Sequence, residues 1–182
     1  MSAISEVIEL RSCPHHRAAQ FEPVRRQLIV CNAVRLDSTM SIVYRIHREM
    51  GATLVLWEGV VTADDFLAHV RRLTSDADWP PPRRLHLSVL QMASLDASMD
   101  DATIERAADL YGKHRSKIAN MKVAIVAGVA FMTAVAFERE IARYGASAIV
   151  FNSLDIACTW LGIGTDEVER ILKLLRTQSP TG

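Results

Sequence analysis

The segment Lys122–Ala127, with the sequence K-V-A-I-V-A, constrains the fold of this chain more than any other. After the lysine every residue is apolar, and most of them are valine or isoleucine. Such a strand is typical of the centre of a sheet, where both faces are buried and neighbouring strands are joined by helical crossovers. The chain is therefore expected to build a helix-covered sheet around this segment.

Four further strands are predicted at Ile42–His47, Thr53–Val61, Arg84–Leu90 and Ala148–Phe151. The connection between the first two is short, which predicts an antiparallel hairpin. The later strands alternate with helical patterns, which favours right-handed parallel crossovers. The predicted fold class is α/β, with a mixed sheet of about five strands. An antiparallel opening hairpin is followed by parallel crossovers, and helices cover the sheet.

Helical patterns fill the segments between the strands. Thr62 is a good N-cap before an acidic first turn, and Phe66, Val70 and Leu73 then recur on one face. Gly145 stands where a left-handed residue often ends a helix. The other helices are predicted from about Asp100 to Ile118, from about Phe131 to Tyr144, after Ser153 and after Thr165.

Residues 1–39 differ from the rest of the chain, because no periodic pattern is sustained there and only Gln27–Val34 has strand character. The regular pattern starts at Met40. We therefore divide the chain into an N-terminal extension, 1–39, and a domain with a C-terminal helix, 40–182. The extension is either a misassigned start ahead of Met40 or a real, irregular arm.

Composition narrows the function classes. The 21 basic and 21 acidic residues balance, whereas nucleic-acid binders usually show a basic excess, so no nucleic-acid partner is predicted. No apolar run reaches the roughly 18–20 residues of a membrane span. The N-terminus lacks a signal-peptide pattern, and the three cysteines match no disulfide scaffold. These features predict a cytoplasmic protein with free thiols.

Four segments resemble the SpoIIAA-like family, which has the STAS fold and consists mostly of uncharacterised bacterial proteins. They are Leu54–Phe66, Arg84–Ser88, Val123–Ala127 and Val150–Gly162. The last holds a D-x-A-x-x-W-L pattern, the most specific of the four, and the resemblance covers about residues 41–163. It implies a non-enzymatic regulatory or protein-interaction module. Because the fold is related to that of lipid-binding domains, a binder of a small apolar or lipid-like ligand is the alternative.

The resemblance also implies a phosphoacceptor candidate, Ser98. The family places a serine at the start of the helix after the third strand, but Ser98 lies two residues further from the strand and Met99 replaces a glycine. The alternative is a capping or loop serine, because Asp100 and Asp101 would repel a phosphate.

The helix from Phe131 is apolar nearly all round, more than one buried stripe requires. Its simplest interpretation is packing between the sheet and a neighbouring helix. Alternatively, Phe131, Met132, Val135 and Phe137 line an apolar pocket or a homodimer seam. The predicted partners are accordingly a protein, a second copy of the chain or an apolar small molecule.

No catalytic motif, metal site or cofactor is predicted. The acidic pairs Asp64-Asp65, Asp100-Asp101 and Asp166-Glu167 all open helices, where they balance the helix dipole. His69, His86 and His114 are interpreted as surface or satisfied, partly buried histidines. Cys13, His15 and His16 are close enough for metal binding but lack a partner motif, so a loop is favoured. An enzyme without a recognisable motif is the third hypothesis.

Overall fold

The computed structural model describes residues 41–178. The extension 1–39, with Cys13, His15, His16 and the strand candidate Gln27–Val34, lies outside these residues, and so does the end of the chain after residue 178.

The described residues form a five-stranded sheet in the order β1-β2-β3-β4-β5. Strand β1 runs antiparallel to β2, and each later pair is parallel. The predicted fold class, an α/β fold with a mixed sheet, is thus confirmed. The strands are β1 (Ile42–His47), β2 (Ala52–Val61), β3 (Leu85–Leu95), β4 (Lys122–Val126) and β5 (Ser147–Phe151).

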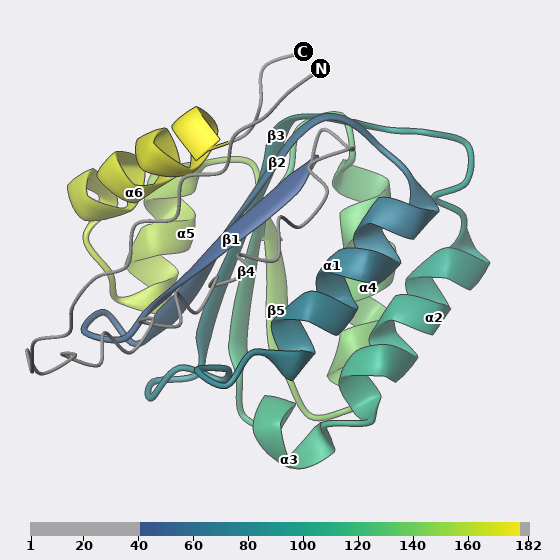
Figure 1. The fold of residues 1–182 in the computed structure, drawn as a ribbon, viewed down its shortest axis with the longest axis horizontal. Helices are drawn as coiled ribbons and strands as arrows, with labels where there is room; N and C mark the ends of the chain where they lie inside the picture. The colour runs from purple at the N-terminus through teal and green to yellow at the C-terminus, as the bar shows by residue number, and fades with distance from the viewer. Residues whose placement is uncertain (1–40, 179–182) are drawn as a thin grey trace, which may run out of the picture. The chain divides into compact units, whose positions relative to one another are not determined.

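Helices cover both faces of the sheet (Figure 1). Three helices lie on one face: α1 (Ala63–Ser75), α2 (Asp101–Gly112) and α4 (Phe131–Ala142). The short α3 (Arg115–Ile118) follows α2. The opposite face is covered by α5 (Leu154–Leu161) and α6 (Thr165–Gln178).

Strand β4 explains why both helical layers are needed. Val123 and Ile125 belong to the core under α1, α2 and α4, whereas Ala124 and Val126 belong to the core under α5 and α6. All four side chains are buried. Because burying a valine or isoleucine side chain contributes about 1.5–3 kcal/mol, uncovering the face with Val123 and Ile125 would lose two such contributions, and uncovering the other face would lose that of Val126.

Two elements differ from the sequence predictions. Strand β3 continues to Leu95 instead of ending at Leu90, because β2 supplies pairing partners as far as Val61. The single helix predicted from Asp100 to Ile118 is instead α2 and α3, with α2 ending at Gly112. A Cβ atom at Gly112 would lie 2.3 Å from the Tyr144 ring, so a larger residue there would require that ring to shift, and glycine is a weak helix former.

A capping box fixes the start of α1, as the sequence predicts. The Thr62 side chain accepts a hydrogen bond from the Asp65 amide, and the Asp65 carboxylate accepts one from the Thr62 amide. Below this cap, Phe66, His69 and Val70 are buried against the sheet. The cap therefore holds the first turn of a helix whose inner face enters the core.

We predict that Thr62→Ala lowers the free energy of unfolding by about 1 kcal/mol, because it leaves the Asp65 amide without its partner. Urea denaturation measures this change. Ser153→Ala is the matched control, since Ser153 occupies the N-cap position of α5 but makes no side-chain capping hydrogen bond. Equal losses in the two variants would contradict the role assigned to Thr62.

Candidate functional site

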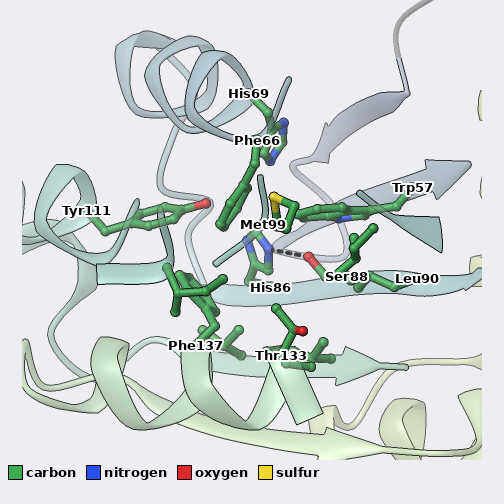
Figure 2. A pocket seen from close by; sticks show the side chains of 15 residues that line it. Trp57, Phe66, His69, His86, Ser88, Leu90, Met99, Tyr111, Thr133 and Phe137 are labelled. Carbon is green, nitrogen blue, oxygen red and sulfur yellow. Dashed lines mark hydrogen bonds between the residues drawn. The ribbon is translucent and has the colours of Figure 1, made fainter. Parts of the chain in front are cut away.

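A cavity lies between the sheet and the layer formed by α1, α2 and α4 (Figure 2). Its volume is about 40 Å³. The side chains that line it come from three strands, three helices and the loop after β3. They are Trp57, Phe66, His69, His86, Ser88, Leu90, Leu95, Met99, Ile104, Tyr111, Val123, Ile125, Thr133, Ala134 and Phe137.

Strand alternation supplies the floor of the cavity. His86, Ser88 and Leu90 are spaced by two along β3, so they point to the same face of the sheet. In the register of the sheet, His86 is paired with Val123 and Ser88 with Ile125 of β4. The floor is therefore built from adjacent positions on neighbouring strands, with polar groups only on β3.

Aromatic rings form much of the wall. Phe66 of α1 lies with its ring centroid 5.1 Å from that of Trp57 and 5.7 Å from that of Phe137 on α4. The rings of Phe137 and Tyr111, the latter on α2, are 6.1 Å apart. These distances are in the range of favourable tilted and edge-to-face contacts, so the three helices are joined by one aromatic cluster.

Several polar groups are enclosed with the aromatic rings. His86 Nε2 and Ser88 Oγ form a hydrogen bond of 3.0 Å, drawn in Figure 2. Trp57 Nε1 and His69 Nδ1 are buried and have no hydrogen-bond partner within the described residues. A buried polar group without a partner costs about 1–3 kcal/mol. Side chains that line the cavity thus include polar atoms that the described residues leave without a hydrogen-bond partner.

All the titratable groups of the cavity are held in their neutral forms. Burial lowers the pKa of His69 to about 3, assisted by repulsion from His86 and Arg72. Burial also lowers the pKa of His86 to about 4 and raises that of the Tyr111 hydroxyl. At neutral pH the cavity is therefore apolar, with uncharged hydrogen-bonding groups.

The two histidines compare differently with the interpretation made from the sequence. His86 has a hydrogen-bond partner in Ser88, as interpreted, but is buried rather than partly buried. His69 is buried with an unpaired nitrogen, which the interpretation did not include. His86 and Ser88 have the spacing of a base and a nucleophile. However, no carboxylate among the cavity residues orients His86, and a pKa of about 4 makes its imidazole a weak base. This arrangement suits binding better than nucleophilic catalysis.

Ser98 lies beside the cavity, in the loop between β3 and α2. Its hydroxyl donates a hydrogen bond to the Asp96 carboxylate and accepts one of 2.8 Å from the Ala63 amide at the start of α1. Thr103 Oγ1 donates to the Ser98 carbonyl oxygen at 2.9 Å. The loop that carries Met99 into the cavity wall is therefore tied to both α1 and α2 through Ser98.

The four apolar candidates on α4 separate in the structure. Phe137 lines the cavity. Phe131 and Met132 are exposed at the start of the helix, and Val135 lines a groove that also includes Ala148 of the edge strand β5. The structure thus brings only Phe137 into the cavity.

The other cavity residues were missed by the sequence analysis. The available signal was the pair His86 and Ser88, two polar residues spaced by two in an otherwise apolar strand. Such spacing places both polar groups on one buried face, which indicates a polar feature inside the core.

The region of residues 41–178 contains no group of three or more histidine, cysteine or acidic side chains that could hold a metal ion. Its helices are too short or too polar to cross a membrane.

No protein-family model matches the sequence, and no curated protein matches it.

We predict that the protein loses stability as the pH falls below about 6.5, the ordinary pKa of histidine. Because the pKa values of His69 and His86 are lowered to about 3 and about 4, the unfolded chain binds protons that the folded chain does not. The free energy of unfolding is therefore highest above about pH 6.5, and it decreases as the pH falls toward the pKa values that the two histidines have in the folded chain. The loss is about 1.4 kcal/mol per pH unit for each histidine.

Urea denaturation between about pH 7 and pH 5 measures this slope, in a range that lies above most carboxylate titrations. His69→Leu removes one of the two groups and should roughly halve the slope. A slope that is flat in the wild type, or unchanged in the variant, would show that the histidines are not held neutral by the fold.

Proposed function

We propose that this domain binds a small, mainly apolar molecule in the cavity beneath α1, α2 and α4. The observation that carries the proposal is the combination of an aromatic wall with buried polar groups that have no hydrogen-bond partner among residues 41–178. Small-molecule sites in proteins are typically concave and mostly apolar, with a few polar groups that fix the orientation of the ligand. The cavity has this composition.

The size of the cavity sets a condition on binding. A volume of about 40 Å³ is enough for water but is small for an organic molecule, since an apolar cavity of about 150 Å³ is known to hold benzene. Binding therefore requires part of the wall to move. Met99 is suited to this, because it is partly buried, lies outside regular secondary structure and has an adaptable thioether side chain.

This proposal corresponds to the alternative implied by the resemblance to the SpoIIAA-like family. Membership of that family is itself part of the proposal and is supported by the hairpin, the parallel crossovers and the helix after β5. In this view the protein is not an enzyme.

A protein-interaction function is the second candidate, and exposed apolar side chains near the start of α4 favour it. Val129 and Met132 are 87% and 74% exposed, and Met92 on β3 is 70% exposed. A Cβ at Gly128 would lie 3.2 Å from the Gln91 carbonyl oxygen, so the turn before α4 packs on the part of β3 that carries Met92. Contiguous exposed apolar groups commonly mark a contact surface.

Native mass spectrometry of the full chain, purified gently from its source cell, tests both functions. Ligand binding predicts a small molecule that is retained in the native spectrum and lost on unfolding. Thr133→Leu, which enlarges a side chain that lines the cavity, should lose this molecule. Val135→Leu should keep it, because Val135 lies on the same helix but outside the cavity.

A chain that carries no small molecule but retains a second polypeptide would favour the interaction function instead. Equal retention of the small molecule in both α4 variants would contradict its assignment to this cavity.

A further inference from the structure

The cavity offers a ligand no charged partner. None of the side chains that line it is aspartate, glutamate, lysine or arginine. Moving an unpaired ion from water into such surroundings is strongly unfavourable. The histidines do not supply a charge either, since His69 and His86 are both held neutral. These conditions select against carboxylate, phosphate and ammonium groups at this site.

Two of the side chains that line the cavity carry a donor with no partner among the described residues. An indole nitrogen can only donate a hydrogen bond, and Trp57 Nε1 is buried without a partner. The Tyr111 hydroxyl forms no hydrogen bond with a described residue, and its raised pKa keeps its proton in place. A ligand that pairs with the Tyr111 hydroxyl proton must bring an acceptor.

Tyr111 is placed to make this contact. Its side chain extends from α2, and Figure 2 shows its hydroxyl pointing into the cavity toward Phe66 and His86. The ring is held by Phe137 on one side and by Trp79, whose ring centroid is 6.1 Å away. Because both neighbours are bulky and Trp79 is buried, the direction of the hydroxyl is fixed before a ligand arrives.

The other polar pair on the cavity floor is already matched. His86 and Ser88 hydrogen-bond to each other at 3.0 Å, so they need less from a ligand than Tyr111 does. Trp57 Nε1 and His69 Nδ1 also lack partners among the described residues, but both atoms are shielded by the packing around them. The Tyr111 hydroxyl points into the cavity, so it is the polar contact that a ligand can reach without breaking an existing hydrogen bond.

We propose that the ligand is an uncharged, ring-bearing molecule whose carbonyl-type oxygen accepts a hydrogen bond from the Tyr111 hydroxyl while its apolar part packs against Phe66 and Phe137. This inference rests on the proposed function and adds the chemical class of the ligand. In this inference the Tyr111 hydroxyl selects ligands that carry an acceptor, whereas Phe66 and Phe137 bind any apolar ring.

Three probes of nearly equal size test this class: acetophenone, α-methylstyrene and benzoate. The first is a neutral ketone, the second replaces the ketone oxygen with a CH2 group, and the third is an anion. Dissociation constants are measured by NMR titration on the full chain, after native mass spectrometry has shown it to be free of ligand. Acetophenone should bind about five- to tenfold more tightly than α-methylstyrene, the value of one hydrogen bond, and benzoate should bind most weakly.

Tyr111→Phe removes only the hydroxyl and should bring the affinity for acetophenone down to that for α-methylstyrene. The affinity for α-methylstyrene should stay within about twofold of its value in the wild type. Tyr44→Phe is the matched control. The Tyr44 hydroxyl donates to Asp76 Oδ2 at 2.9 Å, and Tyr44 does not line the cavity, so the preference for acetophenone should remain.

The outcomes separate this inference from the proposed function. Equal binding of acetophenone and α-methylstyrene to the wild type, or a preference that survives Tyr111→Phe, would overturn the role of Tyr111 and leave ligand binding intact. If benzoate bound most tightly of the three probes, the inference that the ligand is uncharged would be overturned. No binding of any probe would contradict the proposed function as well.

Discussion

From Val123 to Val126 every side chain of β4 is buried, and the rest of the domain is arranged to maintain this burial. The strands from β2 to β5 follow one another across the sheet in sequence order. Because parallel crossovers are right-handed, connections that advance in one direction place all their helices on the same face. The crossovers α1, α2 and α4 therefore form one layer, and the opposite face would be exposed to water without α5 and α6.

The two cores that result have different chemistry. Under α5 and α6, the sheet presents aliphatic residues such as Leu54, Leu87 and Val89, and the packing there is typical of a core that serves stability. The core under the crossover helices holds the aromatic cluster, two neutral histidines and the cavity. We attribute binding to the second core because, within residues 41–178, the buried polar groups without partners all lie on that side of the sheet.

The sequence was sufficient for the architecture but not for the cavity. Strand composition and short connections predict the hairpin and the crossovers, and the Thr62 cap is visible as a local pattern. Gly112, at the end of α2, leaves room for the ring of Tyr144, which is distant in the sequence, so local periodicity could not reveal this contact. The cavity requires the register of β3 against β4 together with the rotation of three helices. Consequently His86 and Tyr111 were not recognised as neighbours.

The candidate residues that the sequence predicted on α4 identify only part of the cavity, because they were chosen by apolar character. Apolar character all around that helix is a weak guide, since Phe131 and Met132 are exposed and, of the four apolar candidates, only Phe137 lines the cavity. A polar residue in an apolar strand is more informative, because burial of a hydrogen-bonding group is costly and is retained only where the fold pairs it or uses it.

The most direct test of the central claim is a high-resolution crystal structure of the full chain purified gently from its source cell. The account predicts electron density for a small molecule within the cavity, with an oxygen in hydrogen-bonding distance of the Tyr111 hydroxyl and an apolar part against Phe66 and Phe137. Side chains of Tyr111, Phe137 and Met99 packed against one another, with no space between them, would contradict it.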